Sequence, residues 1–205
     1  MIGEPESRVF LIDDDESVRK GISLLLLSGG YNVETFENAK DFLESDFGKV
    51  PGCILLDIFL GEASGLELHD AIRMKYSQFP IIYITGHGDV PMSVQALKKG
   101  ALNFLQKPID DTHLFQAIDE GLSLSRGLIS FQIERNSLKT RFDSLTPREY
   151  EIFRFVIRGL LNKQIASELC IAEHTVKLHR GKITEKLGVK SVPEMIYMAE
   201  KLNIK

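Results

Sequence analysis

The sequence predicts a doubly wound α/β domain with a five-stranded parallel sheet, followed by an all-α helix-turn-helix domain. Three observations support this division. Short apolar runs alternate with helical patterns up to residue 110, only helical patterns follow, and the charge balance differs between the two halves. The 205 residues are enough for two domains, and a hydrophobic content of 43% allows ordinary cores.

Five short segments of the first half are predicted strands, namely residues 8–12, 32–36, 53–57, 80–85 and 103–106. The segments between them carry apolar residues at a spacing near 3.6, as in Val18, Ile22 and Leu26. The run CILLD is apolar up to its last residue, which is typical of a central parallel strand buried on both faces. This alternation indicates parallel strands covered by helices on both faces.

The predicted domains are residues 1–125 and 142–205, joined by a helical linker over 126–141. Asp110 or Asp111 can cap a helix that precedes the linker. The linker contains no proline, and we interpret it as partly helical, with continuity with the preceding helix left open.

Four short helices are predicted after residue 145. The first has a Thr146 cap and Glu149 three residues later, which form a capping box. The others are expected to start at the cap Asn162, at Glu173 or His174, and after the cap Ser191. No strand pattern occurs here, so the second domain is predicted to be all-α.

Composition limits the classes of function. Residues 1–140 carry 13 Lys+Arg and 21 Asp+Glu, whereas residues 141–205 carry 12 and 8, so the second half can face a polyanion, although many solvated helical domains show a similar excess. Cys53 and Cys170 are interpreted as reduced packing residues. No apolar run approaches ~18–20 residues and the first residues lack a signal-peptide pattern, so we predict a cytoplasmic protein without membrane contact.

Acidic side chains follow two of the predicted strands. Asp13, Asp14 and Asp15 come directly after the first, and Asp57 ends the third. If these strands are neighbours, the carboxylates converge outside the carboxyl ends of the strands, where ligands bind in open α/β sheets. Clustered carboxylates repel one another, and Mg²⁺ is the hard cation that such a cluster accepts together with phosphate oxygens.

Two further strand-end residues complete a set suited to phosphoryl transfer. Lys107 follows the fifth strand with a positive charge, and Thr85 ends the fourth with a hydroxyl. Phosphoryl transfer depends mainly on positioning and charge neutralisation, which a carboxylate nucleophile, a metal and a lysine can supply. Each residue alone is more often a helix cap or a turn residue, but five of them at four strand ends favour a site, namely Asp13, Asp14, Asp57, Thr85 and Lys107.

Residues 8–125 resemble the receiver domain of two-component response regulators, the CheY-like, flavodoxin-like fold with strand order 2-1-3-4-5. The resemblance implies phosphorylation of Asp57 by a sensor histidine kinase, and a helix-capping role for Asp15. It implies Mg²⁺ ligation by Asp13, Asp14, Asp57 and the Phe59 carbonyl, phosphoryl contacts from Thr85 and Lys107, a switch role for Phe104 and a cis bond before Pro108.

The loop after Asp57 departs from the family pattern. Leu60 and Gly61 stand where Met-Pro is usual, so this loop is expected to be looser. Phe59 is large and apolar where a polar side chain is common. We hypothesise that Phe59 and His87 shield the phosphoryl group from water and alter its lifetime.

The third helix of the second domain is basic, and its charge alone also fits a solvated face. The strings LTPREYEIF, NKQIA, TVKLH and KLGVKS resemble the LuxR/NarL-type DNA-binding domain. The resemblance makes residues 163–169 a scaffold helix and 173–187 a recognition helix. The DNA-contact residues that it implies are Lys163, Thr175, Lys177, Leu178, Arg180, Gly181 and Lys182, with Val176 and Ile183 in the core.

The last helix resembles the dimerisation helix of that family, with Val192, Met195, Ile196 and Ala199 along one side. Cys170 replaces a glycine common in the turn, so a positive φ there would cost about 1 kcal/mol. Gly181 in the recognition helix is expected to allow close approach to DNA.

The whole chain resembles the FixJ/NarL class of transcription regulators. This implies that phosphorylation of Asp57 controls homodimerisation and binding to double-stranded promoter DNA, with RNA polymerase as a further candidate partner. Enzymatic activity is expected to be limited to self-phosphorylation and slow self-dephosphorylation. Two alternatives stay open: a docking protein whose basic domain does not read DNA, and an aspartyl-phosphate hydrolase.

Overall fold

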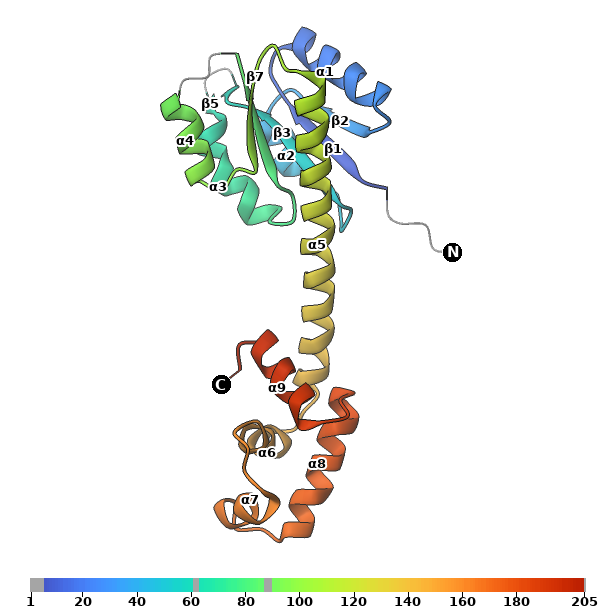
Figure 1. Cartoon of the computed structure of the whole chain (residues 1–205), viewed down its shortest axis with the longest axis vertical. Coiled ribbons are helices and arrows are strands. Elements are labelled where there is room, and N and C mark those ends of the chain that lie inside the picture. Colours follow the sequence, from blue (N-terminus) through green and yellow to red (C-terminus); the bar gives the residue numbers. More distant parts are fainter. Residues whose placement is uncertain (1–5, 61–62, 87–89, 205) are drawn as a thin grey trace. The chain divides into compact units, whose positions relative to one another are not determined.

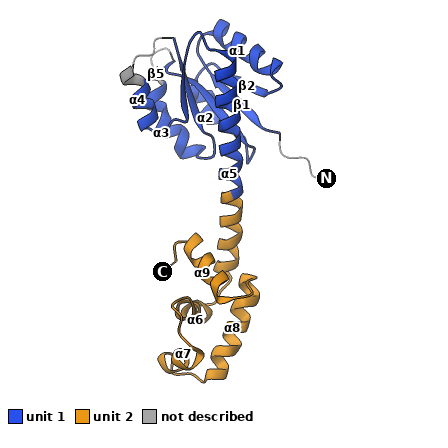
Figure 2. Ribbon diagram, in the orientation of Figure 1, with its two compact units in different colours: residues 1–130 blue, residues 131–205 orange. Residues whose placement is uncertain are grey.

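The computed structural model describes residues 6–60, 63–86 and 90–204. The chain forms two compact units, Met1–Ser130 and Phe131–Lys205 (Figure 2). Strands are confined to the first unit among the described residues, and the second unit is helical (Figure 1). His87 and Gly61, which we singled out in the sequence, lie outside the described residues.

The first unit contains a five-stranded parallel sheet in the order β2-β1-β3-β6-β7. The strands are β1 Arg8–Ile12, β2 Asn32–Phe36, β3 Gly52–Asp57, β6 Ile81–Thr85 and β7 Asn103–Gln106. All five predicted strands are confirmed to within one residue at each end, and the order matches the expected 2-1-3-4-5. A short antiparallel pair, β4 Phe59–Leu60 and β5 Ala63–Ser64, was not predicted.

Helices cover both faces of this sheet (Figure 1). They are α1 Glu16–Ser28, α2 Ala39–Glu44, α3 Gly65–Lys75, α4 Val90–Lys98 and the beginning of α5 Asp111–Asp143. Residues of α1 and α5 pack with Val9 and Leu11, whereas residues of α2, α3 and α4 pack with Phe10 and Ile12. Alternate side chains of a strand point to opposite faces, so β1 contributes to two separate cores.

Side-chain caps start the helices that flank the sheet. The carboxylate of Asp15 accepts the N–H groups of Ser17 and Val18, which confirms its capping role at α1. The Asp110 carboxylate accepts the N–H of His113 at the start of α5. This last helix is 33 residues long, and residues 126–141 lie within it.

The second unit is built from α6 Pro147–Ile157, α7 Asn162–Glu168, α8 Glu173–Leu187 and α9 Val192–Lys201, with the end of α5. The predicted capping box is present: Glu149 accepts the Thr146 N–H at 2.8 Å and donates its own N–H to Thr146 Oγ1 at 3.3 Å. Ser191 caps α9, as predicted. The predicted core positions Val176 and Ile183 are fully buried.

The predicted cap of α7 is wrong by one residue. Leu161 is the N-cap, and its N–H donates to Oε1 of Gln164 at 2.8 Å. Asn162 is instead the first helical residue, and its side-chain oxygen accepts a hydrogen bond from Arg180. Cys170, in the turn after α7, has a φ of 51°, so the backbone strain that a positive φ would bring applies there. Cys170 is exposed, so its interpretation as a packing residue is wrong, whereas Cys53 is buried.

Among the described residues, no helix combines the length and apolar character that a membrane crossing requires.

Candidate functional site

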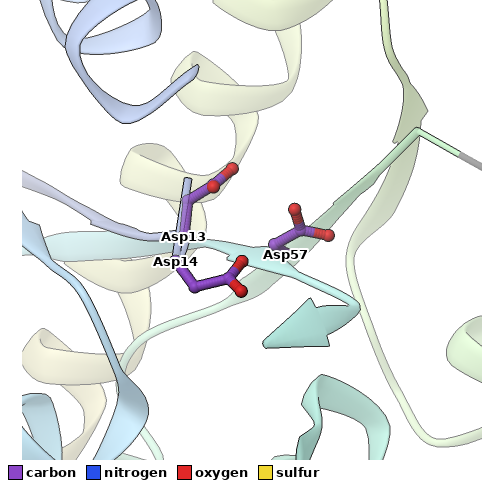
Figure 3. A group of neighbouring side chains, drawn as sticks. All are labelled: Asp13, Asp14 and Asp57. Atoms are coloured by element: carbon purple, nitrogen blue, oxygen red, sulfur yellow. The ribbon is translucent and has the colours of Figure 1, made fainter. Parts of the chain in front are cut away.

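Three aspartates gather at the carboxyl ends of the two central strands β1 and β3. Ile12 pairs with Leu56, so Asp13 and Asp57, which follow them, are side by side. The ligand oxygens of Asp13, Asp14 and Asp57 all lie within 4.8 Å of one another (Figure 3). Parallel strands bring their ends to the same edge, which explains why residues 44 positions apart meet here.

Lys107 joins two of these carboxylates. Its Nζ donates to Asp13 Oδ2 at 2.7 Å and to Asp57 Oδ2 at 2.6 Å. Burial raises the pKa of Asp13, which is fully buried, and Lys107 partly offsets this effect. Burial alone would lower the pKa of Lys107, but the two carboxylates outweigh burial and the pKa is raised. The lysine is therefore a fixed positive charge beside Asp57.

Backbone and arginine groups fix the orientation of the same aspartates. The N–H of Phe59 donates to Asp57 Oδ1 at 3.1 Å, and the N–H of Asp15 donates to Asp13 Oδ1 at 2.9 Å. The Arg19 guanidinium donates to the Asp13 carbonyl oxygen at 2.6 Å. The carboxylates are thus held in place by neighbours, and Asp57 presents its oxygens at the strand edge.

The other expected receiver residues lie on the adjacent strands. Thr85 ends β6 and is fully buried, and its carbonyl accepts the Lys107 N–H at 2.7 Å. Phe104 on β7 is half-buried and pairs in register with Tyr83. The Lys107–Pro108 peptide bond is cis, as expected. Phe59 is 49% exposed, so its ring is accessible to water on one side.

The acidic cluster suits a hard divalent cation. It offers carboxylate oxygens from three residues, which are the ligands that Mg²⁺ prefers in proteins. Asp14 is exposed, whereas Asp13 and Asp57 are buried, so the cluster opens to solvent on one side. An ion that keeps several waters fits such a half-open site.

The exposed face of α8 presents the expected DNA-contact residues of the second unit. Lys177, Leu178, Gly181 and Lys182 are all exposed, and Leu178 has 63% of its surface free. A side chain at Gly181 would meet nothing within 4 Å, so this position is open. The expected contact Lys163, on α7, is also exposed.

The remaining two expected contacts are less accessible. Thr175 is half-buried, and Arg180 donates to Asn162 Oδ1 at 2.8 Å, which ties α8 to the start of α7. The Arg180 guanidinium therefore already has a hydrogen-bond partner within its own domain, without any DNA phosphate. Within α8, the Thr184 hydroxyl donates to the Arg180 carbonyl. Nothing in the sequence predicted the contact between the Arg180 side chain and Asn162.

The predicted dimerisation stripe needs correction. Met195 and Ala199 are 2% and 3% exposed and pack in the core of their own unit, so they cannot meet a partner without opening it. Val192 is half-buried against the same core. Of the four predicted residues only Ile196 is exposed, and Tyr197 beside it is 51% exposed.

Two contacts of the second unit escaped the sequence analysis. Lys186 donates to Glu149 Oε2 at 2.6 Å, and Arg148 donates to the Leu169 carbonyl at 3.1 Å. Both tie the start of α6 to other helices of the domain. The capping box identified Glu149, but nothing in the sequence placed Lys186, which is 37 residues away, against it.

Comparisons with known proteins match both units. The family described as "Response regulator receiver domain" matches residues 9–119, and "Bacterial regulatory proteins, luxR family" matches residues 143–199. Response regulator protein TodT of Pseudomonas putida is 40% identical over 96% of this chain and 86% of its own length. FixJ of Bradyrhizobium diazoefficiens is 34% identical over 95% of both chains.

Solved structures agree with this assignment. The response regulator StyR, at 44% identity, covers 96% of this chain and 99% of its own with a TM-score of 0.84. Full-length FixJ from B. japonicum, at 32% identity, covers 97% and 98% with a TM-score of 0.56. Matches of this extent to both units show that the chain belongs to the response regulators, as a FixJ-type transcriptional regulator that joins a receiver to a LuxR-type DNA-binding domain.

Proposed function

We propose that Asp57 accepts a phosphoryl group from a sensor histidine kinase in a reaction that requires Mg²⁺. The observation that carries this proposal is the placement of Asp57 within 4.8 Å of two further aspartates and 2.6 Å from Lys107. Asp13, Asp14, Asp57 and the Phe59 carbonyl would hold the metal, which would neutralise phosphate charge. Lys107 and Thr85 would contact the phosphoryl oxygens.

Phosphorylation would alter the first unit through Thr85 and Phe104. In this scheme the Thr85 hydroxyl moves toward the phosphoryl group, and Phe104 turns into the space that it leaves. Thr85 is the last residue of β6, and Phe104 is the second residue of the neighbouring strand β7, where it already packs against the core formed with α2, α3 and α4. A modification shifts such an equilibrium only if it favours one state, and the added charge supplies that difference.

We infer that α8 enters the major groove of promoter DNA. Its exposed face carries Lys177 and Lys182 for phosphates or base edges, and Leu178 for apolar contact. Lys163 on α7 and Thr175 supply further backbone contacts. Gly181 leaves room for close approach of the helix. Arg180 would have to share its guanidinium between Asn162 and DNA.

Homodimerisation on phosphorylation would place two such helices on two half-sites, about 34 Å apart. Ile196, exposed on α9, is the remaining candidate for a dimer contact in the second unit. We also propose that residues 1–125 act as the receiver, 126–141 as the connecting helix and 142–205 as the DNA-binding domain, which the family matches support. RNA polymerase is a further candidate partner.

The test combines phosphorylation with DNA binding. Purified protein is incubated with acetyl phosphate and Mg²⁺ and analysed on phosphate-affinity gels, and binding to promoter fragments is measured with and without beryllofluoride. We expect one phosphoryl group in the wild type and none in Asp57→Asn, with tighter DNA binding only in the activated wild type. The control Asp70→Asn, at an exposed aspartate, should behave as the wild type.

Two results would contradict the proposal. Phosphorylation of Asp57→Asn would mean that another residue accepts the phosphoryl group. Unchanged DNA binding after activation would mean that the first unit does not control DNA binding by the second. Absence of salt-dependent, sequence-selective DNA binding would favour a docking protein. Many turnovers of acetyl phosphate would favour a hydrolase, whereas we expect slow loss of one phosphoryl group.

A further inference from the structure

A buried tyrosine of β6 and a buried histidine of α3 are in contact in the first unit. Tyr83 on β6 and His69 on α3 are both fully buried, and Tyr83 Oη lies 3.0 Å from His69 Nδ1. The same hydroxyl donates to the carbonyl oxygen of Gly65 at 3.2 Å. We propose that Tyr83 and His69 are positioning residues, which hold Gly65 against the backbone of Asp57 and thereby set the Mg²⁺ affinity.

The hydrogen bond from Tyr83 to Gly65 goes with one tautomer of His69. A hydroxyl has a single proton, so when Tyr83 donates to Gly65, the Nδ1–H of His69 donates to Tyr83 Oη. Burial lowers the pKa of His69 and raises the pKa of Tyr83. Both side chains are therefore neutral near pH 7.

Gly65, the first residue of α3, lies directly against the phospho-acceptor strand. A Cβ added to Gly65 would lie 2.4 Å from the Asp57 carbonyl oxygen, so only glycine fits at this contact. The Gly65 N–H donates to the Ile58 carbonyl at 2.7 Å. The start of α3 and the end of β3 are thus in backbone contact, and a shift of one displaces the other.

The expected metal ligand Phe59 directly follows Ile58 and pairs in register with Ser64, the residue before Gly65. Its N–H donates to Asp57 Oδ1, and the N–H of Ile58 donates to the Ile84 carbonyl at 3.1 Å. Gly65, which is bonded to the residue before Phe59 through the Ile58 carbonyl, accepts the hydrogen bond of the Tyr83 hydroxyl. Loss of that hydroxyl would leave the Gly65 carbonyl and His69 with one partner fewer, and the Phe59 carbonyl would lose its fixed position.

This inference rests on the proposed function, because it assigns the pair to the Mg²⁺ site. The test is Tyr83→Phe, which keeps the ring and removes only the hydroxyl. Tyr76→Phe is a matched control. Tyr76 directly follows the carboxyl end of α3 and is also buried, and its hydroxyl also donates to a backbone carbonyl, that of Ser45. Both variants lose a hydrogen bond from a tyrosine hydroxyl to a backbone carbonyl, but only the bond lost in Tyr83→Phe involves Gly65.

Calorimetric titration with MgCl₂ alone gives the affinity, and acetyl phosphate gives the rate of phosphorylation. We expect Tyr83→Phe to raise the Kd for Mg²⁺ roughly tenfold, the lower end of the loss found when a hydrogen-bond partner of a metal ligand is removed, because Tyr83 acts on Phe59 through Gly65. Phosphorylation should be slow at limiting Mg²⁺ and recover at saturating Mg²⁺. Tyr76→Phe should keep the wild-type Kd to within about twofold.

The outcomes separate this inference from the proposed function. If the wild type binds Mg²⁺ and Tyr83→Phe binds it equally well, the inference is wrong and the proposed function stands. An equal loss in Tyr76→Phe would mean a general loosening of α3 and would also overturn the inference. A wild type that does not bind Mg²⁺ would remove both. If circular dichroism finds Tyr83→Phe unfolded, His69→Leu decides: weaker Mg²⁺ binding supports the inference, and wild-type binding overturns it.

Discussion

Lys186 on α8 and Glu149 on α6 form an ion pair at 2.6 Å in which the carboxylate is 4% exposed. The same carboxylate closes the capping box of α6, and Lys186 also donates to the Ser144 carbonyl at 3.1 Å. One lysine of α8 therefore holds the start of α6 in place. This gives it a structural role that the exposed lysines of the helix do not share.

Replacement of Lys186 should destabilise the second unit. In Lys186→Met the buried Glu149 carboxylate loses its cation, which should lower the free energy of unfolding by about 2 kcal/mol. Lys182→Met, at an exposed lysine of the same helix, should change it by less than about 0.5 kcal/mol. Urea titrations followed by circular dichroism measure both values. Equal stabilities would contradict the role of the pair.

The stability of the second unit should also depend on pH through Glu149. Hydrogen bonds from Lys186 and the Thr146 backbone lower the pKa of Glu149 from 4.5 to about 2. A carboxyl group with a lowered folded-state pKa stabilises the fold above its unfolded pKa, and this stabilisation is lost as the pH falls from about 4.5 toward 2. The melting temperatures of the wild type and Glu149→Gln should therefore converge as the pH falls through that range. Parallel pH profiles would exclude the effect.

Removal of Lys107 should make the first unit dependent on metal. Without the lysine, Asp13 and Asp57 lose the cation that lies within 2.7 Å of both. We expect Lys107→Met to lose about 3 kcal/mol of stability in a chelator and to regain part of it with Mg²⁺. Lys99→Met breaks a more exposed pair with Asp70 and should change stability by less than about 1 kcal/mol. The melting temperature with and without Mg²⁺ is the measurement, and an unchanged value for Lys107→Met in chelator would contradict it.

Two glycines of the first unit should respond in opposite directions to alanine. Gly65→Ala places a methyl group 2.4 Å from the Asp57 carbonyl oxygen and should cost more than about 2 kcal/mol. Gly21→Ala meets nothing within 4 Å inside α1 and should gain up to about 1 kcal/mol. Chemical denaturation of both variants tests the contrast. A neutral Gly65→Ala would mean that α3 can move away from Asp57 at little cost.

The salt dependence of DNA binding should identify phosphate contacts. If Lys177 neutralises one phosphate, Lys177→Ala should reduce the slope of log K against log salt by about 1. Lys40→Ala, at an exposed lysine of α2, should leave the slope unchanged. Fluorescence anisotropy with a labelled promoter fragment at several salt concentrations gives both slopes. An unchanged slope for Lys177→Ala would mean that this residue does not neutralise a phosphate.

The sequence predicted those parts of the fold that depend on local pattern. The five strands and their convergent aspartates follow from apolar runs that end in Asp57 or Thr85, because parallel strands bring their ends together. The cap Asp15 and the Thr146 capping box follow from spacing within one turn.

Contacts between distant side chains could not be predicted in this way. The Tyr83–His69 pair and the Lys186–Glu149 pair join residues from different elements, and no periodicity specifies which side chains will meet. The stripe on α9 shows the same limit. An apolar face on a helix predicts burial, but Met195 and Ala199 are buried by their own unit, whereas a dimer partner was expected.

The sheet of the first unit divides its interior into a half that contains several aromatic rings and a half whose buried residues are mostly aliphatic. Phe10, Phe42, Phe47 and Tyr83 lie in the half under α2, α3 and α4, and aliphatic residues dominate the half under α1 and α5. Neighbouring residues of one strand therefore pack against different sets of helices. A change of side-chain volume in one half therefore acts first on neighbours in the same half, so substitutions next to Phe104, the proposed switch residue, leave the contacts of the opposite half in place.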